Sequence, residues 1–207
     1  MNNYVSDDVH AFNEQLRDIE NRYNRAVVTL RKIEAAAGAI ATIEFTVTPA
    51  GATAAGEHPE IYVINNDTNT EEKVREITGW VHILPGFPAT RPVVCFSSKK
   101  PLKHINVFPG GRMCTGNDDQ TTLSILMDNV IGACIYNLAP NTANYGDPAN
   151  IAAVEWQKEK ERNGEFPLID PAKIFNNTAK PLPQPVVRKA SAQKRRNGTL
   201  PPVVVHR

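Results

Sequence analysis

The chain has 207 residues, of which 41% are hydrophobic and 22% are charged, and its formal net charge is +1. This length suffices for one compact domain of roughly 150 residues with extensions. A net charge this small provides no overall field that attracts nucleic acid or an anionic membrane. The sequence has no apolar run near the ~18 residues of a membrane helix, and its first residues do not resemble a secretory signal. We therefore expect a cytoplasmic protein that binds neither membranes nor nucleic acid.

The first segment, 1–38, is predicted to be an extended N-terminal helix over residues 6–37. Ser6 suits the N-cap and Gly38 suits the stop. An apolar stripe recurs at alternating spacings of four and three, comprising Phe12, Leu16, Ile19, Tyr23, Ala26, Leu30 and Ile33. The stripe either packs on the domain or, because the repeat spans about three heptads, mediates self-association or partner binding as a coiled coil.

The next segment, 39–163, is predicted to be the folded core and begins with strands. Alternating or β-branched stretches separated by turn residues predict four strands, at 40–48, 60–64, 76–84 and 93–97. Because the connections between them are short, an antiparallel four-stranded meander is the simplest arrangement.

Two helices and a tail complete the chain. Residues 121–138 are apolar on nearly every side, which predicts a buried helix. Asp147 and Pro148 suit the N-cap and first turn of a second helix that ends near Gly164. Residues 164–207 are rich in proline and basic residues, so we expect a tail that is disordered or bound to a partner.

Three cysteines, Cys95, Cys114 and Cys134, contain no CxxC pair and leave one thiol unpaired, which excludes a disulfide framework. The histidines show no ligand spacing, so we expect no metal and no cofactor. Cys95 and Cys134 lie in a predicted strand and the apolar helix, where they are expected to be inert core residues.

Cys114 ends the irregular segment HINVFPGGRMC, which follows the last strand and starts at His104. Gly110 and Gly111 permit backbone conformations that present a thiol close to another chain. The neighbouring Arg112 favours formation of a thiolate. These residues alone identify only a candidate reactive cysteine.

The order and spacing of these features resemble the ubiquitin-conjugating enzyme family. That family carries a His-Pro-Asn motif with its active cysteine eight residues beyond the asparagine, and here His104-Ile105-Asn106 precedes Cys114 at that spacing. A strand, a proline-rich turn and a strand lead into the motif, and an apolar helix and an acidic residue followed by proline come after it. The resemblance covers roughly residues 6–163. It implies an α+β fold with an N-terminal helix, a four-stranded antiparallel meander, an active-site loop and two C-terminal helices.

The resemblance also implies an activity. Cys114 would accept a ubiquitin-like protein from an activating enzyme as a thioester and pass it to an amine of an acceptor protein, expected to be lysine. Asn106 would donate its side-chain amide to the oxyanion or hold the loop in shape, and Asp147 would orient or deprotonate the amine. The implied supporting residues of the active-site loops are His104, Asn144 and Tyr145, with His104 bracing the loop rather than moving protons.

Two departures from the family pattern indicate a divergent branch. Ile105 replaces the usual proline, and the segment that follows Cys114 is shorter than usual and lacks a tryptophan. Bacterial ubiquitin-like conjugation operons, some of them linked to phage defence, contain such branches. An inactive family member that serves as a binding scaffold is one alternative, although it would be expected to lose Cys114 or Asn106. A cysteine hydrolase with His104 as the base is another, although the motif turns this histidine into the loop.

Overall fold

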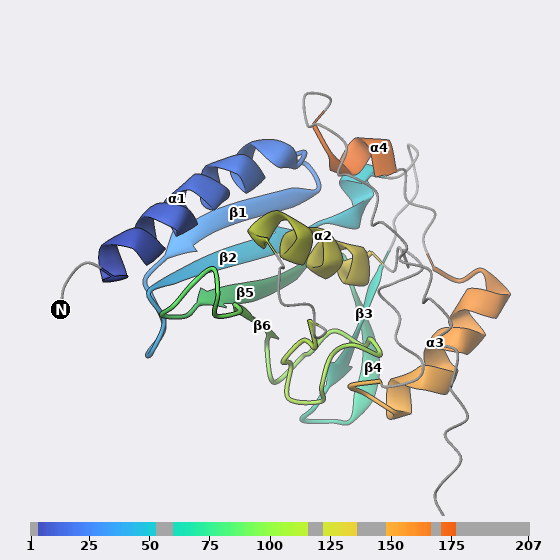
Figure 1. Cartoon of the computed structure of the whole chain (residues 1–207). Helices are drawn as coiled ribbons and strands as arrows, with labels where there is room; N and C mark the ends of the chain where they lie inside the picture. The colour runs from blue at the N-terminus through green and yellow to red at the C-terminus, as the bar shows by residue number, and fades with distance from the viewer. Residues whose placement is uncertain (1–3, 53–59, 116–121, 136–147, 167–170, 177–207) are drawn as a thin grey trace, which may run out of the picture.

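The computed structural model describes residues 4–52, 60–115, 122–135, 148–166 and 171–176 (Figure 1). The elements in chain order are α1 (Tyr4–Arg22), β1 (Val28–Ile33), β2 (Ala41–Val47), the 3-10 turn η1 (Pro49–Ala52), β3 (Ile61–Asn65), β4 (Thr70–Val74), β5 (Ile77–Ile83), β6 (Val93–Phe96), α2 (Leu123–Cys134), α3 (Ala152–Asn163) and α4 (Pro171–Ile174). The predicted α+β class is confirmed. Within the described ranges, no helix is both long and apolar enough to span a membrane.

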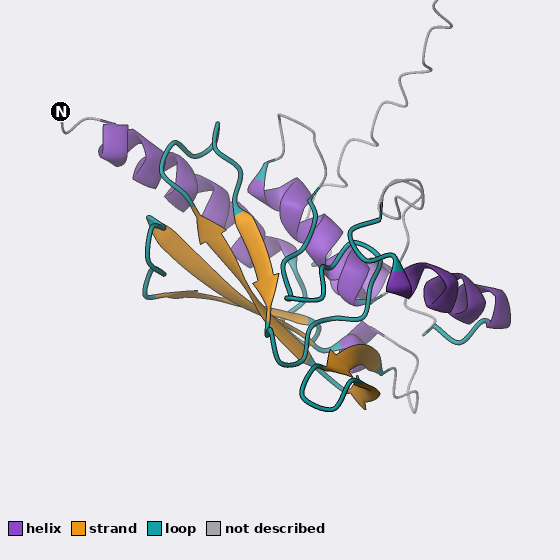
Figure 2. Cartoon of the chain, turned by 90° about the horizontal axis from the view of Figure 1, so that it is seen from below, coloured by secondary structure: helices purple, strands orange, loops and turns teal. Residues whose placement is uncertain are grey.

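The main sheet is antiparallel and has four strands in the order β1-β2-β5-β6, while β3 and β4 form a separate hairpin. Side chains alternate along β5, so that Ile77, Val81 and Ile83 are buried whereas Trp80 and His82 are half-buried. One face of the sheet therefore forms the core. α1 and α2 contact each other and lie on this face (Figure 2).

The apolar stripe of α1 packs on the domain as far as Tyr23. Phe12, Leu16 and Ile19 are buried in the main core. At the end of the helix, the Arg22 guanidinium donates to both carboxylate oxygens of Asp128 at 3.1 and 2.8 Å, and the Tyr23 hydroxyl donates to the same carboxylate at 2.6 Å. Burial and the Asp128 carboxylate raise the pKa of Tyr23 above its ordinary range. These bonds tie α1 to α2.

The prediction of a helix over 6–37 is wrong beyond Arg22. The Asn24 side chain accepts a hydrogen bond from the Ala26 N–H at 3.0 Å, which makes a turn. The chain then forms β1, which pairs with β2 from Val28 opposite Val47 onward. The spacing of the apolar residues fits a helix, but β2 supplies backbone partners for this β-branched stretch. Within the described residues α1 and β1 thus belong to the folded core, and the helix ends too early for a coiled coil of three heptads over 6–37.

The number of strands in the main sheet was predicted correctly, but their identity was not. The predicted strand 60–64 corresponds to β3, which pairs with β4 instead of joining the main sheet. β1 takes the fourth place. The sequence of β4, TEEKV, has no apolar alternation, because this strand is largely exposed. Its presence, and hence the partner of β3, was not predictable from periodicity.

The buried helix predicted over 121–138 is α2, which starts at Leu123. Thr122 is its N-cap and accepts a hydrogen bond from the Ile125 N–H at 3.3 Å, as expected for a capping threonine. Cys134 is fully buried near its end, and burial raises the pKa of this thiol, which agrees with an inert core residue.

The second predicted helix is α3, which ends as expected at Gly164 with φ of +64°. It begins at Ala152 rather than Pro148, so the prediction that Asp147 caps it is wrong. The preceding Asn150 donates its N–H to the Ile105 carbonyl at 2.9 Å. The segment before α3 is therefore used to contact the loop that carries Cys114, instead of starting the helix.

The prediction that 164–207 is a tail is wrong for its first part. α4 returns to the end of α1, where the Asn24 N–H donates to the Ile174 carbonyl at 2.8 Å. Ile174 is buried, and the Phe175 ring lies 5.7 Å from that of Tyr23. Residues 177–207 lie outside the described ranges.

Candidate active site

The loop after β6 extends the main sheet. The Phe96 N–H donates to the Gly111 carbonyl at 2.8 Å, and the Met113 N–H donates to the Val94 carbonyl at 2.9 Å. Residues 111–113 thus run antiparallel to β6, with Arg112 opposite Cys95. The segment that leads to Cys114 is held by backbone hydrogen bonds rather than being irregular.

Residues 106–114 form a tight hairpin. Val107 lies opposite Met113, and the Cys114 N–H donates to the Asn106 carbonyl at 2.7 Å. In an antiparallel ladder of this register Asn106 stands directly opposite Cys114, which for such pairs brings the Cβ atoms to about 5 Å. The eight-residue spacing in the sequence is therefore the spacing that places the two side chains next to each other.

The turn of this hairpin depends on Gly111. The Gly111 N–H donates to the Phe108 carbonyl at 2.8 Å and closes the turn. Gly111 has φ of +88°, and a Cβ atom here would stand 2.6 Å from the carbonyl oxygen of Phe96. Only glycine meets both conditions. At Gly110, by contrast, a Cβ atom would meet no atom of the described residues within 4 Å, so lack of space does not require glycine there.

The two sides of the hairpin differ in burial. Val107 and Met113 are 0% and 4% exposed and face the core. On the other side Cys114 and Arg112 are exposed and Phe108 is 42% exposed, whereas Asn106 opposite Cys114 is 9% exposed. The thiol is therefore presented to other molecules from a backbone that is anchored underneath.

His104 lies beneath the loop. It is fully buried, and its Nδ1 accepts a hydrogen bond from the Asn106 N–H at 3.0 Å. Burial lowers the pKa of His104 to about 4, so the ring is neutral at pH 7. Its acceptor nitrogen is bound to the backbone of Asn106, which is the geometry of a brace rather than of a base for Cys114.

The backbone of Ile105 is held on both sides, by α3 and by the segment that precedes it. Its N–H donates to Oε1 of Gln157 at 3.2 Å, and its carbonyl accepts from the N–H of Asn150. Proline at position 105 has no N–H and could not make the first of these bonds. Gln157 is fully buried and was missed by sequence reasoning. Its position four residues after Ala153, on the same face of a helix with many charged residues, is the feature of the sequence that indicates its burial.

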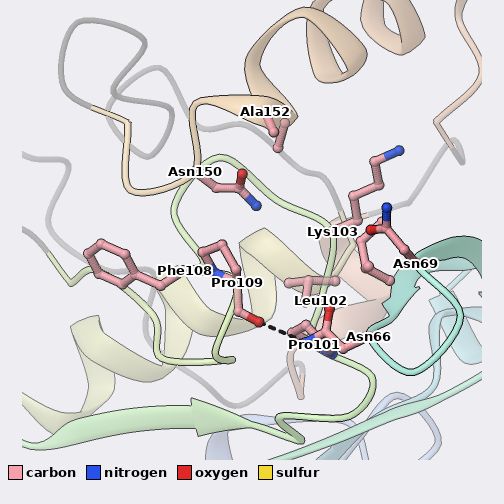
Figure 3. Close-up of a pocket in the computed structure, with 11 residues that line it drawn as sticks. Asn66, Asn69, Pro101, Leu102, Lys103, Phe108, Pro109, Asn150 and Ala152 are labelled. Atoms are coloured by element: carbon pink, nitrogen blue, oxygen red, sulfur yellow. Dashed lines mark hydrogen bonds between the residues drawn. The ribbon is translucent and has the colours of Figure 1, made fainter.

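A groove of about 180 Å³ lies beside this loop (Figure 3). Its walls come from the β3–β4 hairpin, from the strand-like segment before His104, from the turn of the 106–114 hairpin, and from the start of α3. The lining residues are Ile64, Asn66, Asn69, Pro101, Leu102, Lys103, Phe108, Pro109, Asn150, Ala152 and Ala153. The Asn66 side-chain amide joins two of these walls, because it donates to the Pro109 carbonyl at 2.9 Å.

The structure brings together three of the predicted site residues, Cys114, Asn106 and His104. Asp147, Asn144 and Tyr145 lie outside the described residues. Within the part of the chain that is described, no cluster of three metal-ligating side chains exists.

Cys95 does not face the core as expected. Along β6 it is Val94 and Phe96 that are buried, whereas Cys95 is half-buried on the opposite face. Partial burial raises the pKa of Cys95 despite the nearby Arg112. A raised pKa disfavours the thiolate, so Cys95 is a poorer candidate nucleophile.

Comparison of the chain with models of known protein families and with curated proteins finds no match. The function of the protein is therefore inferred from the geometry of the site and from the resemblance of the sequence motifs.

Proposed function

We propose that this protein is a carrier of the ubiquitin-conjugating type, which accepts a ubiquitin-like protein on Cys114 and transfers it to an acceptor amine. The observation that carries the proposal is the position of Asn106 opposite Cys114 across the hairpin, with the Cys114 thiol exposed. This arrangement sets an amide donor beside a nucleophile that a large partner can reach.

The order of the elements supports the same proposal. A helix, the antiparallel sheet β1-β2-β5-β6, the loop that carries the cysteine, a buried helix and a further helix follow one another along the chain. We propose a ubiquitin-conjugating-like fold in which the β3–β4 hairpin is an insertion between the second and third strands of the main sheet.

The chemistry consists of two acyl transfers. In the first, the Cys114 thiolate attacks the thioester carbonyl that joins the modifier to its activating enzyme, and the thiol of that enzyme leaves. In the second, an acceptor amine attacks the new thioester, an amide bond forms, and the Cys114 thiolate leaves. The Asn106 amide donates a hydrogen bond to the oxyanion, which for one such donor contributes about 2.7–4 kcal/mol. Asp147 is the proposed group that orients or deprotonates the amine.

The geometry favours a carrier over the alternatives. A cysteine hydrolase needs a base beside its thiol, and the Nδ1 atom of His104 is bound to the backbone of Asn106 in the buried side of the loop. An inactive scaffold has no need for an exposed thiol paired with an amide. We further propose that the carrier acts in the cytoplasm, within a bacterial ubiquitin-like conjugation system.

The test uses the purified protein with ATP, an activating enzyme and a ubiquitin-like protein. We expect an adduct that reducing agent cleaves, and expect Cys114→Lys to form an adduct that resists reducing agent. A thiol-labile adduct on Cys114→Ser would overturn the proposal. Asn106→Ala is expected to form the adduct normally but to transfer it to lysine about 100-fold more slowly.

A further inference from the structure

The groove beside the active loop is continuous with the candidate site through Phe108. In the register of the 106–114 hairpin, Phe108 is the diagonal neighbour of Cys114 on the same face, a relation that corresponds to about 7–8 Å. This is the length of two residues of extended chain. A peptide whose reacting residue lies at Cys114 can therefore reach Phe108 with a side chain about two residues away.

The lining of the groove is apolar at its base and amide-bearing at its rim. Three asparagines, Asn66, Asn69 and Asn150, lie around it (Figure 3). Lys103 is the one charged residue among the described residues that line the groove. It forms an ion pair with Glu71, and its Nζ atom lies 4.3 Å from the centre of the Trp156 ring. The groove thus offers apolar surface and hydrogen-bonding amides, and its charge is already compensated.

The volume of the groove limits what it can hold. A cavity of about 150 Å³ lined by apolar residues accommodates benzene, whereas sites for drug-sized ligands and cofactors occupy ≈ 300–1,000 Å³. The groove, at about 180 Å³, is therefore of the size of one large side chain.

The walls of the groove are fixed before any ligand binds. Asn66 donates to the carbonyls of Ser98 and Pro109 at 2.6 and 2.9 Å, and the Ile64 N–H donates to the Pro101 carbonyl at 3.1 Å. The wall at the start of α3 is attached to the active loop by the hydrogen bond from the Asn150 N–H to the Ile105 carbonyl. A site assembled in advance loses little affinity to ordering its own groups.

We infer that this groove is a subsite for one uncharged apolar side chain of the acceptor, located about two residues from the amine that attacks the thioester. The inference rests on the proposed function. The acceptor is the occupant because one wall is Asn150, three residues after the residue proposed to orient the amine. The Asn69 side chain and the side-chain carbonyl of Asn66, whose two amide hydrogens are already used, hydrogen-bond the backbone of the acceptor while the apolar side chain of the acceptor enters the groove.

The experiment measures acyl transfer to short peptides with the full-length protein. Cys114 is acylated with acetyl-glycyl-glycine from its thioester with a small thiol, so that the Cys114 thiolate replaces that thiol. Peptides with one lysine are then added, each with leucine at one position from three before to three after the lysine, or with serine throughout. We expect leucine at one preferred spacing to accelerate amide formation roughly tenfold over serine, because the groove buries the leucine side chain.

A variant that fills the groove provides the decisive comparison. Ala152 is exposed at the start of α3 and lines the groove, so Ala152→Trp is expected to reduce the leucine-to-serine rate ratio to about one. Glu159→Trp, at an exposed position of the same helix outside the groove, is the matched control and should retain the full ratio.

The possible outcomes separate the two proposals. A wild-type protein without a leucine preference at any spacing, or an Ala152→Trp variant that retains it, overturns the subsite. Slower acylation by the full-length modifier in Ala152→Trp, with the peptide preference intact, assigns the groove to the modifier instead. Failure of Cys114 to be acylated at all contradicts the proposed function. In that case titration of the unmodified protein with the leucine peptide still tests the subsite, which predicts NMR shifts of the Asn66 and Asn69 side-chain amides.

Discussion

Two hairpins flank the groove, and they differ in the contacts that stabilise them. The β3–β4 hairpin has a continuous ladder from Ile61 opposite Val74 to Asn65 opposite Thr70, and carries ion pairs on its surface. The 106–114 hairpin has a single bridge between Val107 and Met113. It is also held from outside, by backbone hydrogen bonds to β6, by a buried histidine, by a glutamine of α3 and by a backbone N–H of the segment before α3.

This difference shows where each hairpin is vulnerable. Exposed ion pairs contribute little to stability because water and salt screen them, so the first hairpin depends on its backbone ladder and on the burial of Ile61, Tyr62 and Val63 in the core. The second depends on buried polar contacts, each of which is costly to leave unsatisfied. A loop that must present a thiol in one fixed position is thus built from contacts with distant parts of the chain.

Gly111→Ala is expected to have the largest effect on stability and on acylation of Cys114. The new Cβ atom would stand 2.6 Å from the Phe96 carbonyl oxygen, at a φ of +88° that side chains disfavour. We expect the free energy of unfolding to fall by about 3 kcal/mol or more, and acylation of Cys114 to be lost. The control is Gly110→Ala, whose Cβ atom meets no described atom within 4 Å and should change stability little. Equal effects of the two substitutions in urea unfolding would contradict the geometry of the turn.

The second-largest expected effect is a loss of folding stability at low pH, caused by His104. The pKa of His104 is about 4 in the folded protein and 6.5 in an unperturbed histidine, so between these values the unfolded chain binds a proton that the folded protein does not. The stability provided by neutral His104 is therefore complete above pH 6.5 and is lost as the pH falls towards 4, by up to about 3 kcal/mol. Urea unfolding at several pH values measures this loss. His104→Gln, which keeps an acceptor but does not titrate, should lose correspondingly less stability over the same range.

The third effect tests the contact between Gln157 and Ile105. Gln157→Leu leaves the buried Ile105 N–H without its acceptor and should cost about 2 kcal/mol. Ile105→Pro removes the same hydrogen bond from the other side. If the two residues act through this bond, the double variant is less destabilised than the sum of the single variants. Strict additivity in the unfolding free energies would show that the bond is unimportant.

The smallest effect is expected at the surface of the β3–β4 hairpin. Glu72 forms an ion pair with Lys100 at 2.7 Å, and this bond and a second from Asn65 lower the pKa of the Glu72 carboxyl. Because the pair is exposed, Glu72→Gln should leave the melting temperature and the acyl-transfer rate essentially unchanged. A clear loss of stability in this variant would mean that the two hairpins are less different than their contacts suggest.

Features that depend on a few neighbouring residues were predictable from the sequence. The spacing of eight from Asn106 to Cys114, with Gly111 in between, predicts a loop that presents the thiol, and the structure folds this segment into a hairpin. Thr122 caps α2, and Gly164 ends α3 as predicted. In each case the relevant interaction is a hydrogen bond or a dihedral angle within about one turn of the chain.

Features that depend on a distant partner were decided only by the tertiary structure. Leu30 and Ile33 fit the period of a helix but belong to a strand, because β2 provides hydrogen-bonding partners that periodicity does not reveal. Gln157 is recognisable as a support of the active loop only when α3 is placed against Ile105. The sequence by itself determined which thiol is exposed on a glycine turn beside an asparagine. The packing of α3 and the β3–β4 hairpin around that turn decided how it is held and what lies next to it, since such contacts join residues far apart in the chain.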